Sequence, residues 1–330
     1  MRLLRWVLLQ STENTASSFL RSATASSPLS PLAAPPHVQR PKGEDDQGVW
    51  STILNRLALV HNHRRVTTTQ GKTADTKADR RSRWSATGIV GLRDAKLKAN
   101  SLSFPVEVLE LDRSVRTLDL TNNKLADIPE EISKLINMQR LILADNLIEH
   151  LPRNMGKLQS LKLINLDQNR VSILPDELGQ LVKLERLSIS GNCLTTLPET
   201  IGSLRNLLLL NVSNNQLQFL PESIGSCFSL EELQANGNFI EELPSSVCNL
   251  VHLKSLCLDH NKVKQIPPSL LKACKTLQNI SLHDNPISMD QFQSMEGFQE
   301  FEARRKKKFD KQIDSNVMIG SKGLDEGVDL

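Results

Sequence analysis

The sequence predicts an α/β fold, an open horseshoe solenoid of about nine repeats of 23 residues with a parallel sheet on its concave side. The first observation is an asparagine that recurs at one phase, 23 residues apart six times and 24 at the last step: Asn123, Asn146, Asn169, Asn192, Asn215, Asn238, Asn261 and Asn285. The second is the apolar frame L-x-x-L-x-L-x-x-N-x-L around each of them, as in Val115 to Leu125. A fixed period of this size is typical of solenoids, in which each unit packs on its neighbours.

Each repeat contains a short strand and a short helical segment. The alternation at Leu118 and Leu120 places both leucines on one face of a strand, which is the face that a core would cover. The asparagine that follows can bond loop backbone groups that would otherwise be buried unpaired. Segments such as 152–158, 175–181 and 198–204 each begin with proline and carry glycine near their end, which suits a short helix on the convex side.

The two ends of the array depart from the frame. A degenerate first repeat places Val90 and Leu92 at the strand core positions, and residues 99–102 read as a local insertion on the convex side. We expect the repeat domain to span 81–288, followed by one capping helix over 289–314 and a loose tail over 315–330. The capping helix carries the basic cluster Arg304 to Lys308, a pattern seen at lipid or import-receptor contacts and also at solvated helix C-termini.

Residues 1–80 have a different composition and are predicted to be a disordered extension. Arginines lie among apolar residues and serines, and Glu13 is the only acidic residue before Glu44, a composition similar to that of an organelle transit peptide. The alternatives are a variable extension or an upstream segment joined to a shorter protein by a gene model. Gly71-Lys72-Thr73 ends like a phosphate-binding loop, but Val66 stands where the leading glycine of such a loop should be.

Composition excludes several classes of function. The net charge of +3 indicates no bulk attraction to nucleic acid, and no run approaches the roughly 18 apolar residues of a membrane helix. Five cysteines without paired clusters favour reduced thiols in an intracellular compartment. We therefore expect a monomer in the cytoplasm, or in the mitochondrion or chloroplast if residues 1–40 are a transit peptide.

The repeat unit L-P-x-x-[IL]-G-x-L-x-x-L-x-x-L-x-L-x-x-N-x-L resembles the intracellular leucine-rich repeat proteins of the plant Ras-group-related and Shoc-2 (Sur-8)-like type. The resemblance runs from about Arg83 to Asp310. The stretches RWSATGIVGLRDAKLK and MEGFQEFEARRKKKFDKQIDSNVMIGSK are similar to a small plant subfamily related to leucine-rich repeat-containing protein 57. The resemblance implies an adaptor or regulator in intracellular signal transduction, with a small GTPase as one candidate partner.

The predicted partner-binding site is the concave face, because solenoids bind through the strand positions beside the core leucines. These positions form a polar row of mixed charge, which suits a moderate, electrostatically steered protein contact. The predicted residues are Arg93, Asp119, Thr121, Arg140, Asn165, Asp167, Arg186, Ser188, Asn211, Glu232, Gln234, Asn236, Asp259 and His283, with Ile142, Ser190 and Ser213 at the same phases.

One cluster of this row contains metal-ligand residue types. Adjacent strands would bring Asp259 near His283 and His260 near Asp284, with Cys257 beside them, and these are ligand types that suit zinc. Surface ion pairs need only the same residues, so we predict no metal and no cofactor. No serine, cysteine or histidine lies in a nucleophile turn, and a regular ladder forms no closed, dry pocket, so we predict no enzyme. The alternatives to a signalling adaptor are a phosphatase-regulatory subunit and an organelle-targeted repeat protein.

Overall fold

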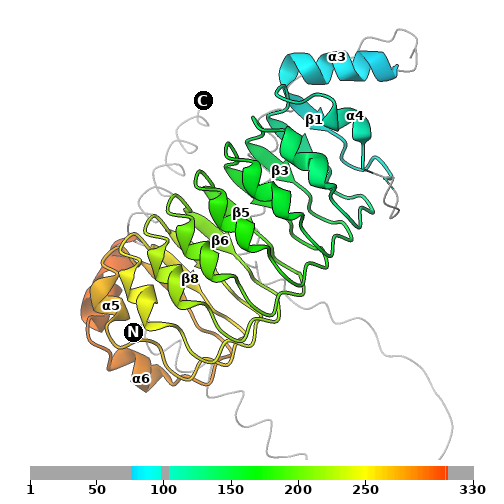
Figure 1. Cartoon of the computed structure of the whole chain (residues 1–330). Coiled ribbons are helices and arrows are strands. Elements are labelled where there is room, and N and C mark those ends of the chain that lie inside the picture. Colours follow the sequence, from blue (N-terminus) through cyan, green and yellow to red (C-terminus); the bar gives the residue numbers. More distant parts are fainter. Residues whose placement is uncertain (1–75, 98–103, 309, 311–330) are drawn as a thin grey trace, which may run out of the picture. The chain divides into compact units, whose positions relative to one another are not determined.

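A computed structural model describes residues 76–97, 104–308 and 310 of the 330-residue chain. The predicted extension and transit peptide, the predicted insertion at 99–102 and the predicted tail over 315–330 lie outside the described residues. The described part is a repeat solenoid that begins at α3 and ends beyond α6 (Figure 1).

One sheet of nine parallel strands lines one side of the solenoid, and its strands follow each other in chain order. They are β1 (Ile89–Gly91), β2 (Thr117–Asp119), β3 (Arg140–Ile142), β4 (Leu163–Asn165), β5 (Arg186–Ser188), β6 (Leu209–Asn211), β7 (Glu232–Gln234), β8 (Ser255–Cys257) and β9 (Asn279–Ser281). The strands stay in register, so that Leu118 lies opposite Leu141. The prediction of a nine-repeat solenoid with a parallel sheet is confirmed.

The strands alternate as the leucine pattern requires. Leu118, Leu141 and Leu187 at the strand centres are fully buried, while the residues on either side of Leu118 are partly exposed. The buried side chains form one core that runs the length of the solenoid. Ile280 of β9 is only partly buried, because the last strand has a neighbouring strand on one side only.

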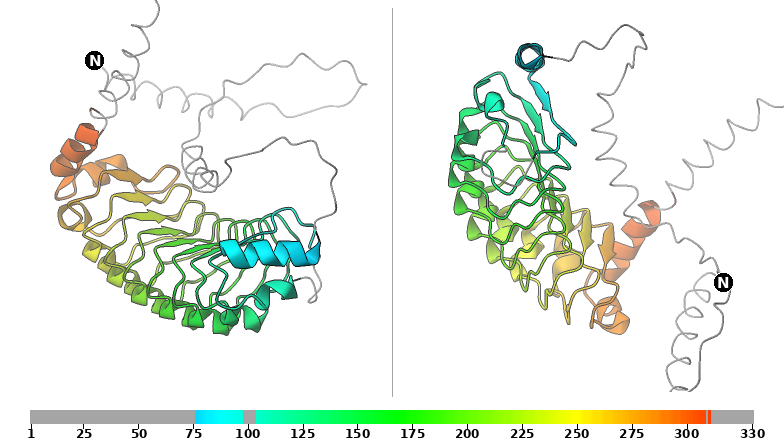
Figure 2. Two further views of the ribbon diagram at one scale, coloured as in Figure 1. Left: turned by 90° about the horizontal axis from the view of Figure 1, so that it is seen from above. Right: turned by 90° about the vertical axis from the view of Figure 1, so that its right-hand side faces the viewer.

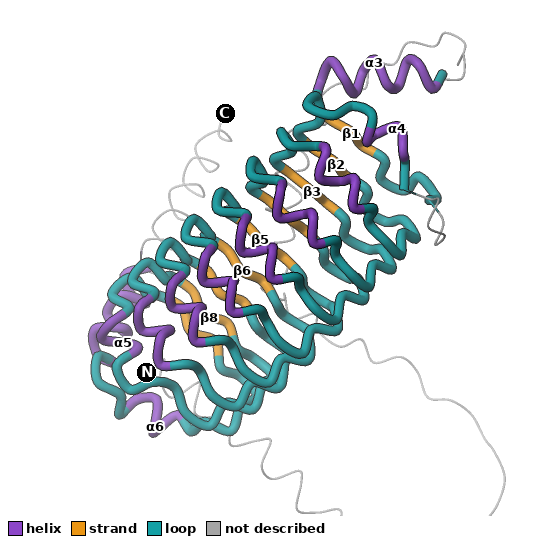
Figure 3. The backbone as a smooth tube through the Cα atoms, viewed as in Figure 1, coloured by secondary structure: helices purple, strands orange, loops and turns teal. Residues whose placement is uncertain are grey.

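The opposite side consists of stacked 3₁₀ turns (Figure 3). They are η1 (Glu130–Lys134), η2 (Arg153–Lys157), η3 (Asp176–Gln180), η4 (Glu199–Ser203), η5 (Glu222–Ser226) and η6 (Ser245–Asn249), with the short helices α4 (Val106–Leu109) and α5 (Leu270–Ala273) at the two ends. Each proline lies at the N-cap, one position before the helical turn in which it was expected. The 3₁₀ turns lie on the outer side of the arc and the strands on its inner side (Figure 2).

Glycine allows neighbouring 3₁₀ turns to approach closely. A Cβ atom added to Gly179 would lie 2.5 Å from the main-chain oxygen of Thr200 in the next turn. Gly156, Gly202 and Gly225 have an equivalent carbonyl at 2.4–2.6 Å. The recurrent glycine therefore has a packing role as well as the helix-ending role that the sequence predicts.

The helix α3 (Lys77–Thr87) covers the N-terminal end of the described solenoid. It starts with a capping box between Thr76 and Asp79 and ends at Gly88, whose φ of 70° is left-handed. Trp84 is its buried residue, at 7% exposure. The helix begins four residues before the expected domain start at 81, because its polar first turn carries no apolar frame from which the sequence could locate it.

The C-terminal cap consists of two helical segments where one helix over 289–314 was expected. The helix α6 (Met289–Gln293) ends before Gly297, whose φ is +88°, and residues 298–308 are helical again. A Cβ atom on Gly297 would lie 2.8 Å from the main-chain nitrogen of Lys272, so this close approach requires glycine. Phe292 packs edge-to-face against Phe298 and Phe301, and Phe301 is 1% exposed.

Candidate protein-binding face

The concave face is formed by the side chains that point away from the core at three positions of each repeat. The first row comprises the strand-initial residues, which include Arg140, Leu163, Arg186, Leu209 and Glu232 on five successive strands. The middle row comprises the last residue of each strand, such as Asn165 and Ser188. The third row lies two residues further along the chain and includes Arg93, Asp167 and His283. All predicted site residues belong to these rows, and the register places equivalent residues side by side.

Sequence reasoning missed two apolar residues of this face, Leu163 and Leu209. Both are partly exposed at the start of their strands, where they alternate with the arginines of the first row. Leucine is also the residue type of the core positions, but the phase of these two residues is that of Arg140 and Arg186. The phase within the repeat is the signal that could have identified them. With Ile142, they make the centre of the face more aliphatic than the polar row expected from the sequence.

The aspartates of the N-terminal half bind neighbouring side chains and backbone groups. The guanidinium of Arg93 lies 3.0 Å from Asp119 Oδ2, and the Thr121 hydroxyl donates to Asp119 Oδ1 at 2.6 Å. Asp167 Oδ1 accepts hydrogen bonds at 2.7 Å from the Ser188 hydroxyl and from the Ser190 amide. Burial raises the pKa of Asp167, and the bonds from these two serines oppose that shift. Both carboxylates therefore have ion-pair or hydrogen-bond partners within the chain.

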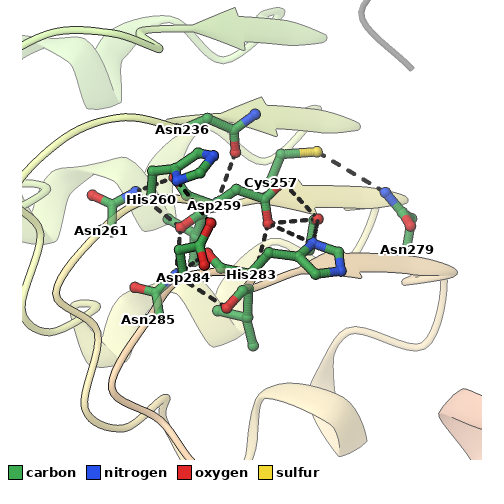
Figure 4. A network of polar contacts seen from close by, with 12 residues as sticks. Asn236, Cys257, Asp259, His260, Asn261, Asn279, His283, Asp284 and Asn285 are labelled. Carbon is green, nitrogen blue, oxygen red and sulfur yellow. Dashed lines mark hydrogen bonds and ion pairs between the residues drawn. The ribbon is translucent and has the colours of Figure 1, made fainter. Parts of the chain in front are cut away.

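A polar network occupies the C-terminal end of the face (Figure 4). The Ser281 hydroxyl donates to Asp259 at 2.6 Å, and His283 Nδ1 lies 3.1 Å from the same carboxylate oxygen. Asn236 accepts a hydrogen bond from the Asp259 amide at 2.9 Å. His260 lies 3.0 Å from Asp284 as a separate exposed pair. The structure thus brings together both pairs expected from the sequence.

The chemistry available to this network is limited. Ser281 contacts His283 through Nδ1, the same ring nitrogen that faces Asp259. A serine triad needs the hydroxyl on one ring nitrogen and the carboxylate on the other, so this contact set is not that of a serine triad. Across the described ranges, no three histidine, cysteine or acidic side chains converge as a metal site would require. The arrangement is that of hydrogen-bonded surface pairs across adjacent strands.

The cysteines of the repeats are two buried thiols and three partly exposed ones. Burial raises the pKa of Cys227 and of Cys274 to about 12, so both remain protonated at neutral pH and are poor nucleophiles. The Cys227 thiol donates to the main-chain oxygen of Ile201 at 3.3 Å. These two cysteines are parts of the convex core.

The basic cluster at the end of the cap divides into structural and exposed residues. Arg304 is partly buried and donates from Nε to the Leu277 carbonyl at 3.0 Å and from a terminal nitrogen to the Leu271 carbonyl at 3.2 Å. Lys306, Lys307 and Lys308 are exposed. The first arginine therefore ties the cap to the last repeat, a role that the charge run did not indicate.

Comparison with known proteins agrees with this architecture. The leucine-rich repeat family matches residues 113–171, and the leucine-rich repeat region family matches residues 153–238. The ectodomain of the Arabidopsis receptor kinase HAESA, solved in complex with the peptide hormone IDA and the co-receptor SERK1, superposes with a TM-score of 0.53 at 27% identity. That match covers 60% of this chain and 34% of the HAESA chain, so this chain spans about a third of that ectodomain.

Curated relatives are closer in sequence. Plant intracellular Ras-group-related LRR protein 7 of Oryza sativa subsp. japonica is 78% identical over 259 residues, which are 78% of this chain and 97% of that protein. Plant intracellular Ras-group-related LRR protein 8 of the same organism is 46% identical over 67 residues, 20% of this chain and 17% of that protein. No helix among the described residues is long and apolar enough to cross a membrane. From its repeats and its near full-length relative, the chain belongs to the plant intracellular Ras-group-related leucine-rich repeat proteins.

Proposed function

We propose that the protein is a non-catalytic scaffold or adaptor in intracellular signal transduction that binds a protein partner on its concave face. The observation that carries the proposal is the continuous three-row surface across nine in-register strands, from Arg93 to His283. Such a rigid surface can contact a large partner without rearrangement, because each repeat is held by its neighbours. The family and the fold are typical of interaction modules, which supports a binding role.

A small GTPase is the first partner to test, since the name of the relative in Oryza sativa contains the term Ras-group-related. The HAESA structure, which holds a peptide hormone and a co-receptor, supports the use of this fold for peptide and protein ligands. We propose the cytoplasm as the location, in line with the word intracellular in the name of that relative. The alternative is the mitochondrion or chloroplast, with residues 1–40 as a transit peptide.

The test uses bulky substitutions at the centre of the concave face. Leu209→Trp and Gln234→Trp add volume on β6 and β7 at partly exposed positions. Asp176→Trp and Glu199→Trp introduce the same side chain at exposed positions on the convex turns and serve as the control. Proximity labelling in intact plant cells should lose a set of proteins with the concave variant and keep that set with the control.

The same variants can be tested with purified small GTPases in both nucleotide states. An unchanged set of labelled proteins in the concave variant would show that the partner does not use this face. For location, the full chain and a version starting at Thr76 are tagged and imaged. A cytosolic signal from both supports the cytoplasmic proposal, whereas an organelle signal from the full chain alone would replace it.

A further inference from the structure

The charged side chains of the central concave face differ in whether they have partners within the chain. Asp119 and Asp167 bind Arg93, Thr121 and two serine groups, as described above. The guanidinium groups of Arg140 and Arg186, in contrast, form no hydrogen bond or ion pair with any residue that the structure describes. Both arginines are partly buried. The face therefore offers two guanidinium groups to a ligand, while the carboxylates of Asp119 and Asp167 are already occupied.

The two arginines have a defined separation. Arg140 lies opposite Leu163, and Leu163 lies opposite Arg186, so the arginines are two strands apart in one row. Neighbouring parallel strands are about 4.8 Å apart, which gives a separation of roughly 10 Å between the two α-carbons. Leu163 lies between the arginines, Leu209 follows Arg186 in the same row, and Ile142 ends the strand that Arg140 begins. Positive and aliphatic side chains thus alternate across β3 to β6.

From this arrangement we infer that the β3–β6 region binds an acidic, leucine-containing segment of a partner protein, with carboxylates on Arg140 and Arg186 and an aliphatic side chain on Leu163. The inference rests on the proposed function and names the chemistry of the partner at that face. Arginine forks bind carboxylates through paired N–H donors, and partial burial strengthens such bonds.

The surroundings set the limits of the site. Glu232 lies two strands beyond Arg186 in the same row, where its charge repels a further carboxylate. Burial raises the pKa of Glu232, and the positive charge of Arg186 opposes that shift, so the two side chains attract each other at this edge of the site. At the rim beside the first row, Lys162 pairs with Glu185 at 2.8 Å and adds little net charge. The three rows contain no Phe, Tyr or Trp on which a nucleobase could stack. A protein segment is therefore favoured over a nucleic acid.

A polyproline-type segment fits the spacing. Such a segment has three residues per turn and a rise of about 3.1 Å, so residues i and i+3 lie on one edge about 9.3 Å apart. A repeated Glu-Leu-Pro peptide would place glutamates along one edge at the separation of the two arginines and leucines along the next edge. This peptide, twelve residues long and carrying fluorescein, is the probe.

The experiment measures fluorescence anisotropy of the probe with the full-length protein at low and physiological salt. Arg140→Glu with Arg186→Glu should weaken binding at least tenfold. The matched control, Arg153→Glu with Arg170→Glu, makes the same charge change at exposed positions outside the three rows and should stay within twofold. The pair Arg140→Gln and Arg186→Gln removes charge without adding repulsion and should weaken binding about as much, which covers the case in which the reversed pair fails to fold.

Other probes decide between ligand classes. A Lys-Leu-Pro peptide should not bind, and a twelve-nucleotide single-stranded RNA should bind more weakly than the acidic peptide. The inference is overturned if the substitutions leave the affinity for the acidic peptide unchanged, if the protein does not bind that peptide, or if RNA binds more tightly. Loss of labelled proteins in the Leu209→Trp and Gln234→Trp variant, together with absence of peptide binding, would keep the proposed function and reject only this inference.

Discussion

The side chain of Asn192 joins its own repeat to Val171 of the repeat before it. Its Oδ1 accepts a hydrogen bond from the Val171 amide at 2.9 Å, and its Nδ2 donates to the carbonyls of Leu166 and Ile189 at 2.9 and 3.2 Å. The residue is 7% exposed. Equivalent bonds recur at Asn123, Asn146, Asn169, Asn215, Asn238, Asn261 and Asn285. The ladder fastens each repeat to its predecessor.

Replacing Asn192 by alanine should lower the free energy of unfolding by roughly 1–3 kcal/mol. The reason is that the backbone amide and carbonyls that are hydrogen-bonded to Asn192 lose their partner in a buried loop. Thermal melting followed by circular dichroism measures the loss. Asn206→Ala is the control, since the exposed Asn206 amide makes one bond to Val182 at 2.7 Å and should cost less than about 0.5 kcal/mol. Equal melting temperatures for the two variants would show that the hydrogen bonds of Asn192 do not hold neighbouring repeats together.

Adding a methyl group at Gly179 should destabilise the convex stack. A Cβ atom there would overlap the Thr200 carbonyl of the next turn, so the expected cost of Gly179→Ala is about 1–3 kcal/mol. At Gly91, on β1, an added Cβ meets nothing within 4 Å. Gly91→Ala should therefore be neutral or stabilise by up to about 1 kcal/mol. Urea denaturation of both variants gives the comparison, and a neutral Gly179→Ala would show that the turns can move apart.

Removing Arg304 should loosen the C-terminal cap. The guanidinium donates hydrogen bonds to the Leu277 and Leu271 carbonyls. Hydrogen bonds from a charged group contribute about 1.5–3 kcal/mol to stability. In Arg304→Ala we expect amide hydrogen exchange around β9 to accelerate tenfold or more, while exchange in β3–β5 stays unchanged. Lys306→Ala, at an exposed position on the same helical segment, should leave both regions as they are. Faster exchange in both variants would point to charge loss rather than to the lost carbonyl bonds.

The stability of the protein should carry a pH dependence that originates at Asp167. Burial holds the pKa of this carboxyl above its ordinary value of 3.8. Between 3.8 and the raised pKa the folded state binds more protons than the unfolded state, so stability falls as pH rises through this window. Asp167→Asn keeps an acceptor oxygen for Ser188 and Ser190 but carries no charge. It should therefore gain in melting temperature over the natural chain at pH 7 and lose that advantage near pH 3.5.

Asp259 provides the matched control for this prediction. It lies at the same phase of a later repeat and pairs with His283 at 3.1 Å. Asp259→Asn keeps an acceptor oxygen but loses the negative charge beside His283, so it should bring no gain in melting temperature at pH 7. A gain of similar size in both variants would assign the effect to the net charge of the chain rather than to the burial of Asp167.

The periodic pattern was sufficient to place the strands, their register and the asparagine ladder. One leucine-rich frame repeated at 23 residues leaves only one way to bury its apolar face, and stacking then brings equivalent residues into line. The same phase placed Asp259 near His283 before any contact was known. Local rules also sufficed for the convex proline, although they located it one residue away from its N-cap position.

Other features depend on contacts between residues distant in sequence, which no local pattern records. The break at Gly297 results from its approach to Lys272, and Arg304 reaches carbonyls 27 and 33 residues earlier. The predicted concave residues from Arg93 to Glu232 include three charges of each sign. The positive residues are Arg93, Arg140 and Arg186, and the negative residues are Asp119, Asp167 and Glu232. Only the folded chain shows that the Asp119 and Asp167 side chains bind their neighbours, while those of Arg140 and Arg186 form no hydrogen bond or ion pair within its described part, because hydrogen bonding depends on side-chain direction across adjacent strands.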